Sequence, residues 1–64
     1  MITIAKTEKF EDDKILVELR GLSTDGEKPT EIGNKTIQNG SIFIEIDTGK
    51  MYMYDLENEE WKEI

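Results

Sequence analysis

Apolar and polar residues alternate in three short runs over the C-terminal part of the chain. The runs are IFIEI at residues 42–46, KMYMYD at residues 50–55 and EWKEI at residues 60–64. A period of two residues places successive side chains on opposite faces of a β-strand. The pattern therefore predicts a meander of three consecutive antiparallel strands, Ile42–Ile46, Lys50–Asp55 and Glu60–Ile64.

The segment Asp47-Thr48-Gly49 separates the first two runs and predicts a three-residue loop. A two-residue loop at Thr48-Gly49 would require a positive φ at threonine, which a β-branched side chain resists. In the longer loop Gly49 takes the left-handed position, where glycine carries no steric penalty. The register that follows pairs Ile46 with Lys50, Ile44 with Tyr52, Phe43 with Met53 and Ile42 with Tyr54.

The next turn has the sequence Leu56-Glu57-Asn58, which fits a second three-residue loop with Asn58 in the left-handed position. Asp55 then lies opposite Glu59, and Met53 lies opposite Trp61. Large side chains in such cross-strand positions stabilise a sheet by packing against each other. The two hairpins place Phe43, Met53 and Trp61 in one row, with Phe43 and Trp61 as core residues, and place Ile42, Ile44, Tyr52 and Tyr54 on the opposite face.

The N-terminal part supplies the strands that can cover this meander. In KILVELRGL, residues 14–22, one side carries Ile15, Val17 and Leu19 and the other carries Leu16, Glu18 and Arg20. The segment MITIAKT adds a strand through Ile2 and Ile4, and KFEDDK, residues 9–14, is predicted to connect the two.

Residues 23–38 contain the only proline and two of the five glycines, so we expect the least ordered part of the chain here. One short strand can lie inside this long connection. The sequence thus predicts a single all-β domain, residues 1–64, made of an N-terminal β unit (1–22), the connection (23–38) and the three-stranded meander (39–64). Five or six short strands would form a small antiparallel sheet, curled into a sandwich or a small barrel.

Composition narrows the range of functions. The 64 residues include no cysteine and no histidine, which removes thiolate chemistry, disulfides and the commonest general base. No signal peptide and no run near the ~20 apolar residues of a membrane span is visible. Fifteen acidic residues against eight basic ones give a net charge of −7, which disfavours nucleic acid and anionic membranes as partners. We expect a soluble protein of a reducing cytoplasm.

Acidic residues near the last turn are the best candidates for a metal site, but their spacing does not match a known metal-binding motif. Asp55, Glu57 and Glu59 alternate like the first ligands of an EF-hand loop, but Glu60 occupies the place of the required glycine. Asp12 and Asp13 form a second acidic pair at an expected loop tip. Asn39-Gly40 resembles a hairpin turn, because no phosphate-loop motif surrounds it. We predict no enzymatic activity, no cofactor, and no catalytic, cofactor-binding or metal-binding residues.

Two segments carry a resemblance to a known group of proteins. GLSTDGEKPTEI and NGSIFIEIDTGKMYMYDLENEEWKEI, within residues 21–64, resemble small uncharacterised proteins of bacteriophages and prophages of Gram-positive bacteria. The shared pattern is a Leu-Ser-Thr-Asp segment, a Lys-Pro-Thr, an Asn-Gly-Ser and an Asp-Thr-Gly-Lys hairpin that ends before a tryptophan. The closing pattern, an aromatic residue, an aspartate, five further residues and a tryptophan, is also similar to β modules of phage fibre and other virion proteins. The resemblance implies a phage or prophage origin and carries no known activity.

Three candidate functions follow from these observations. The first is a non-enzymatic protein, associated with the virion or with its assembly in the bacterial host cytoplasm, that works through protein–protein contacts. The alternative is an acidic inhibitor of a host protein that imitates nucleic acid. A small hydrolase or metal enzyme is the third, and no motif supports it. Both faces of the meander are apolar, and only the N-terminal unit can cover them, so we also expect a homodimer or homotrimer.

Overall fold

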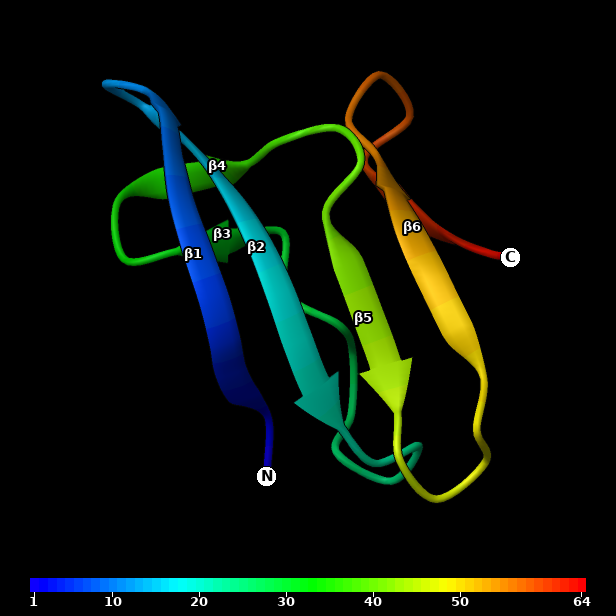
Figure 1. The fold of residues 1–64 in the computed structure, drawn as a ribbon. Coiled ribbons are helices and arrows are strands. Elements are labelled where there is room, and N and C mark those ends of the chain that lie inside the picture. Colours follow the sequence, from blue (N-terminus) through cyan, green and yellow to red (C-terminus); the bar gives the residue numbers. More distant parts are fainter.

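The computed structural model describes the backbone of residues 1–64 and every side chain except that of Phe10. Over this backbone it contains seven strands and no helix, joined in one sheet that curls into a half-barrel (Figure 1). The strands are β1 (Thr3–Glu11), β2 (Lys14–Gly21), β3 (Glu31–Ile32), β4 (Lys35–Ile37), β5 (Ile42–Glu45), β6 (Met51–Asp55) and β7 (Glu60–Glu63). The all-β prediction is confirmed. The predicted antiparallel sheet of five or six strands is wrong in part, because β2 pairs in parallel with both β4 and β5.

Strand β2 lies at the centre of the sheet. Along one edge it pairs antiparallel with β1, through a tight turn at Asp12 and Asp13. Along its other edge β4 pairs with the first residues of β2, and β5 pairs with the segment from Glu18 to Gly21. The prediction that residues 9–14 form a connection is wrong, since β1 continues to Glu11 and β2 begins at Lys14. The side chains of β1 that are described are all exposed, so the alternation of Ile2 and Ile4 predicted only the beginning of this strand.

Ser41 completes the hydrogen bonding of β2 at the point where its partner changes from β4 to β5. The buried hydroxyl of Ser41 accepts a hydrogen bond from the Val17 N–H at 3.1 Å and donates one to the Gln38 carbonyl at 2.8 Å. The Gln38 N–H in turn donates to the Ile15 carbonyl at 2.9 Å. Buried backbone groups need such partners, so a side chain here replaces a missing strand contact.

We predict that Ser41→Ala destabilises the fold by about 1–3 kcal/mol, because it leaves the buried Val17 N–H without a partner. Urea unfolding followed by circular dichroism measures the loss. Thr24→Ala is the control, since Thr24 is exposed and its substitution is expected to change stability by no more than ~0.5 kcal/mol. Equal unfolding midpoints for the wild type and Ser41→Ala would show that the hydroxyl is not needed.

The meander has the predicted strands but not the predicted register. β5 pairs antiparallel with β6, and β6 with β7, yet each pairing is displaced by one residue from the prediction. Phe43 lies opposite Tyr52, and Trp61 lies opposite Tyr54, where Met53 was expected in both cases. A displacement of one residue turns a strand over. Met53 therefore faces solvent, and the predicted row of Phe43, Met53 and Trp61 is wrong for its middle member. The prediction that Tyr52 and Tyr54 lie on the opposite face is also wrong, because both pack on the core side.

The loop between β5 and β6 is longer than predicted. The Glu45 N–H donates to the Lys50 carbonyl and the Gly49 N–H to the Glu45 carbonyl, both at 2.8 Å, so the loop spans residues 46–49. Ile46 cannot pair with β6, because its N–H donates to the Gly21 carbonyl of β2 at 2.8 Å. Gly49 has a φ of 74°, which confirms its left-handed conformation.

The loop between β6 and β7 also has one more residue than predicted. Asp55 lies opposite Glu60, and the loop spans residues 56–59. Asn58 donates to the Asp55 carboxylate from its backbone N–H at 3.4 Å and from Nδ2 at 2.7 Å. The prediction that Asn58 takes the left-handed position is wrong, since Glu59 takes it with a φ of 52°.

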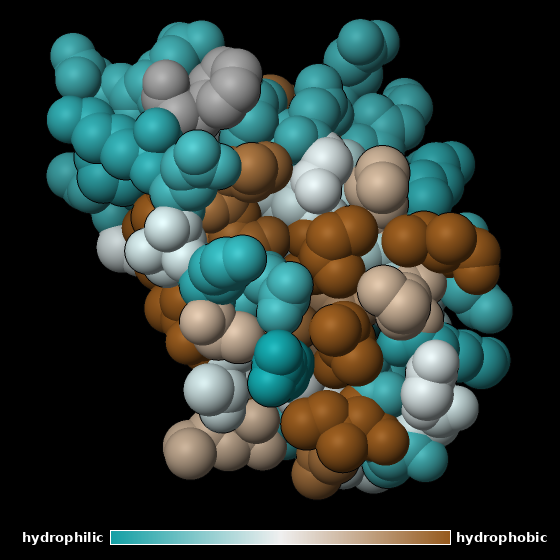
Figure 2. Space-filling view, in the orientation of Figure 1, coloured by the Kyte–Doolittle hydropathy of each residue, from teal (hydrophilic) through white to brown (hydrophobic). Residues whose placement is uncertain are grey.

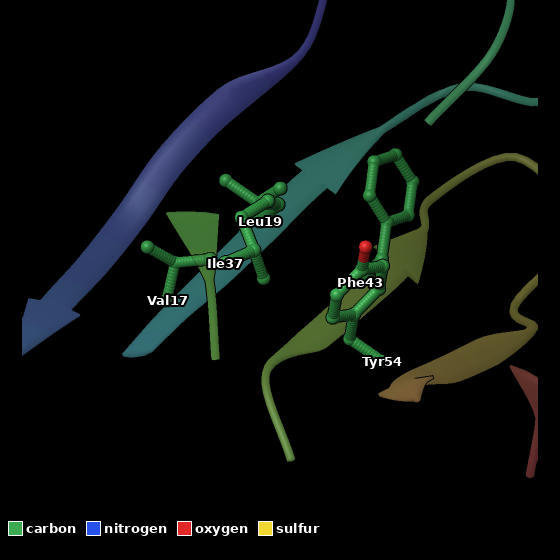
Figure 3. Close-up of a cluster of buried hydrophobic side chains, with 5 residues drawn as sticks. All are labelled: Val17, Leu19, Ile37, Phe43 and Tyr54. Atoms are coloured by element: carbon green, nitrogen blue, oxygen red, sulfur yellow. The ribbon is translucent and has the colours of Figure 1, made fainter. Parts of the chain in front are cut away.

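The hydrophobic core lies on the concave side of the sheet, where β3 and β4 cover β2. Five buried side chains from β2, β4, β5 and β6 meet there, as Figure 3 shows: Val17, Leu19, Ile37, Phe43 and Tyr54. Six partly buried side chains pack around them: Ile2, Ile15, Ile32, Tyr52, Leu56 and Trp61. The predicted connection, residues 23–38, thus contains two strands, and it contributes the fully buried Ile37.

Candidate interaction surface

The acidic residues weighed as metal ligands serve the turns instead. The carboxylate of Asp55 accepts hydrogen bonds from Asn58, while Glu57 and Glu59 are exposed on the same loop. Asp12 and Asp13 are exposed at the β1–β2 turn. Among the side chains that the structure describes, no three acidic residues are placed to hold one metal ion. No helix in the described residues is long and apolar enough to cross a membrane.

Aromatic residues of the meander pack against one another. The Trp61 ring lies 4.9 Å from the Tyr54 ring and 5.9 Å from the Phe43 ring, measured between centroids. Trp61 Nε1 donates to the Pro29 carbonyl at 2.9 Å, which ties β7 to the connection between β2 and β3. Such tilted and edge-to-face contacts are typical of a core. These rings stabilise the concave side and do not form an open stacking surface.

Lys28 and Glu45 form an ion pair on the concave side that the sequence did not reveal. Lys28 Nζ lies 2.9 Å from Glu45 Oε2 and 4.1 Å from the centroid of the Tyr52 ring. Glu45 is only 5% exposed, and its Oε1 accepts a hydrogen bond from the Thr48 hydroxyl at 2.7 Å. Each carboxylate oxygen has a partner, as a charge in this position requires. The pair holds the connection between β2 and β3 against β5.

Three carboxylates at or beside the β5–β6 and β6–β7 loops are held in the ionised form by their partners. The Lys28 ammonium and then the Thr48 hydroxyl keep the pKa of Glu45 below its usual value of 4.5. The hydroxyl and N–H of Ser23 lower the pKa of Asp47 below 3.8, and the Asn58 side-chain amide does the same for Asp55. A carboxylate with a lowered pKa is a weaker base, so these groups are suited to structural hydrogen bonding and not to proton transfer.

These lowered pKa values predict that the protein loses stability in acid. Above about pH 4.5 the three carboxylates are ionised in both the folded and the unfolded chain, and their stabilising effect is complete. Below that pH the unfolded chain takes up protons first, because its carboxylates keep the higher, ordinary pKa values. We expect the melting temperature to fall as the pH is lowered from about 5 to about 3, because the ordinary and the lowered pKa values of these carboxylates lie in roughly this pH interval. Melting curves of Glu45→Gln should be lower than those of the wild type at pH 7 and should depend less on pH; parallel pH profiles would contradict the assignment.

The convex side of the sheet carries a group of neighbouring apolar side chains, several of which are exposed. Figure 2 shows hydrophobic side chains gathered over β5 and β6, beside a mostly hydrophilic surface over β1. We call this surface the outer apolar face; it consists of Ile42, Ile44, Ile46, Met51, Met53 and Ile64. Met51 and Met53 are 43% and 44% exposed, and Ile46 and Ile64 are 63% and 70% exposed. Contiguous apolar surfaces of this kind mark interaction sites on soluble proteins.

A concavity of about 510 Å³ adjoins the outer apolar face on the side of β1. Its lining comes from β1, β2, the start of β5 and the turn before it, and consists of Lys6, Thr7, Glu8, Leu16, Val17, Glu18, Gly40 and Ile42. The lining joins charged groups of both signs to apolar side chains. The convex side thus offers an apolar face with a polar, charged margin, which is the usual composition of a protein interface.

Comparisons of this chain with protein-family models, with curated proteins and with solved structures found no match. The geometry of the convex side is therefore the observation on which function rests. Sequence alone did not separate this face from the core face, because both faces of the meander are apolar. Which side chains of the meander lie on the core face depends on the strand register. Because both loops are one residue longer than predicted, the register is displaced by one residue.

Proposed function

We propose that this protein is a non-enzymatic binding module that contacts a protein partner through the outer apolar face. One observation carries the proposal: the convex side carries six neighbouring apolar side chains, of which Ile46, Met51, Met53 and Ile64 are exposed and Ile42 and Ile44 are partly buried. The concave side of the same small sheet, in contrast, holds the buried core. Burial of such a surface by a partner is favourable by roughly 25 cal/mol per Å² of apolar area. The two methionines suit this role, since their flexible side chains adapt to the shape of a partner.

The resemblance of residues 21–64 to phage and prophage proteins supports a place in a virion or in its assembly. In this proposal the protein is made in the cytoplasm of a bacterial host and acts by protein–protein contact. The alternative, an acidic inhibitor that imitates nucleic acid, has less support from the structure. Glu45, Asp47 and Asp55 are used within the fold, and the convex side carries exposed apolar side chains that such a role does not need.

Affinity capture from a lysate of the bacterial host tests the proposal. Three tagged proteins are compared: the wild type, Met51→Gln/Met53→Gln, and Met51→Leu/Met53→Leu. Glutamine has nearly the shape of methionine but removes its apolar character, while leucine keeps that character. We expect one partner to be retained by the wild type and by the leucine variant and to be lost with the glutamine variant, at equal melting temperatures.

A partner retained equally by all three proteins would place the binding site outside the outer apolar face. A nucleic-acid-binding partner that is released by salt but not by the glutamine substitutions would support the acidic-inhibitor alternative, because screening weakens exposed charge contacts. Capture of the same partner by the glutamine variant at full strength therefore overturns the proposal.

A further inference from the structure

Strand β1 forms an open edge of the sheet. It pairs with β2 alone, whereas β2 pairs with β4 and β5 along its other edge. With nine residues β1 is the longest strand of the chain, and its side chains from Thr3 to Lys9 are exposed. An unpaired edge presents backbone N–H and C=O groups that a further strand can use.

Two contacts on the far side of β2 determine which groups of β1 point outward. The Val17 N–H donates to Ser41, and the Ile15 carbonyl accepts from Gln38, both on the side of β2 that lies away from β1. Residues opposite each other in an antiparallel pair either exchange hydrogen bonds or both point away from the partner strand. Thr7 lies opposite Val17, and Lys9 lies opposite Ile15. The N–H and C=O groups of Thr7 and Lys9 therefore point outward from the sheet.

A second copy of the chain can pair with this edge antiparallel and symmetrically. Three registers place an outward-pointing residue of one copy, Thr7 or Lys9, opposite an outward-pointing residue of the other. A two-fold axis at Glu8 would place two glutamates opposite each other, and an axis at Lys9 would do the same with two lysines. An axis at Thr7 places Lys6 of each copy opposite Glu8 of the other. Like charges directly opposite are destabilising and unlike charges are stabilising, so the charges select the register centred on Thr7.

We propose that two copies pair through β1, antiparallel and about a two-fold axis at Thr7, so that the two sheets become one. The regular part of β1 is short, because its pairing with β2 is irregular between Ile4 and Lys6 and between Lys9 and Glu11. The net charge of −7 on each copy also opposes association. The dimer is therefore weak, with a dissociation constant on the order of 10–100 μM. It goes beyond the proposed function, since it leaves both outer apolar faces open on the same side of the joined sheet.

Sedimentation equilibrium of the wild type between about 5 and 500 μM, in ~0.15 M salt, tests the association. The weight-average mass is expected to rise from the monomer value towards twice that value. Thr7→Pro removes an outward N–H and no hydrogen bond of the β1–β2 pair, so this variant should remain monomeric with the circular dichroism spectrum of the wild type. A wild type that stays monomeric over the whole range, or a Thr7→Pro variant that is folded and dimerises equally, overturns the proposal.

Exchanging the charges of Lys6 and Glu8 tests the register of the dimer without the Thr7→Pro substitution. Lys6→Glu and Glu8→Lys should each weaken the homodimer by at least ~10-fold, because each places like charges opposite one another. The double variant Lys6→Glu/Glu8→Lys restores both unlike pairs and should dimerise like the wild type. A mixture of the two single variants should form a mixed dimer. Failure of this rescue overturns the register.

The outer-face variants separate this dimer from the proposed function. Met51→Gln/Met53→Gln should dimerise like the wild type, because neither methionine lies on β1. Dimerisation that is lost in this variant would show that the two copies associate through the outer apolar face, and would overturn pairing through β1. Partner capture by the monomeric Thr7→Pro variant would still test the proposed function by itself.

Discussion

Trp61→Ala is expected to destabilise the fold by about 3–5 kcal/mol, which is close to the whole stability of a domain of this size. The substitution removes the ring contacts with Tyr54 and Phe43. It also removes the hydrogen bond from Nε1 to the Pro29 carbonyl, so β7 and the connection between β2 and β3 are no longer joined. Urea unfolding at 25 °C, followed by far-ultraviolet circular dichroism, measures the loss.

Trp61→Phe separates the two contributions. Phenylalanine keeps an aromatic ring against Tyr54 and Phe43 but cannot donate to Pro29, so the loss should be intermediate between those of the wild type and Trp61→Ala. A melting curve of Trp61→Ala that coincides with that of the wild type would show that the ring is not part of the core. The aromatic side chain would then have to be reconsidered as a binding group.

Ile37→Ala is expected to cost about 2–5 kcal/mol, because it opens a cavity at a fully buried position. Ile37 is the only core residue that comes from β4, and it lies opposite Ile15 in the parallel pairing with β2. Its truncation should release β3 and β4 from the concave side of the sheet. The free energy of unfolding and the heat-capacity change should both fall, since less apolar surface remains to be exposed.

Asn34→Ala is the matched control for this segment. Asn34 is exposed in the turn between β3 and β4, and its substitution should change stability by no more than ~0.5 kcal/mol. An Ile37→Ala variant as stable as Asn34→Ala would mean that β4 contributes little to the core. The pairing of β4 with β2 would then not depend on the burial of Ile37.

The sequence predicted the strands of the meander, and it missed their register for a local reason. Alternation identifies a strand without setting its partner, and loop length decides the pairing. Here side-chain hydrogen bonds lengthen both loops, from Thr48 to Glu45 and from Asn58 to Asp55. The contact of Ile46 with β2 also comes from outside the hairpin, where no pattern within the hairpin can reveal it.

The parallel part of the sheet was missed for a different reason. β3 and β4 have two and three residues, too few to show a period. The place of β4 beside β2 depends on contacts between residues far apart in the sequence, such as the hydrogen bond from the Thr36 N–H to the Asp13 carbonyl. On the concave side the apolar face of the meander is covered as expected, by side chains of β2 and β4. On the convex side the described chain leaves the face open, and that face is the candidate interaction surface.

The parallel pairing of β2 with β5 also bears on how fast the chain folds. The β1–β2 hairpin and the β5–β6–β7 meander join residues that are near in sequence, whereas β2 and β5 pair across a separation of 24 residues. Closing that long loop costs conformational entropy before its contacts form. The two antiparallel units should therefore form early, and their docking, completed by Ser41 between β4 and β5, should set the folding rate. That step brings Val17 and Leu19 of β2 into one core with Phe43 and Tyr54 of the meander, so the half-barrel should fold as one cooperative unit despite its two separate hairpins.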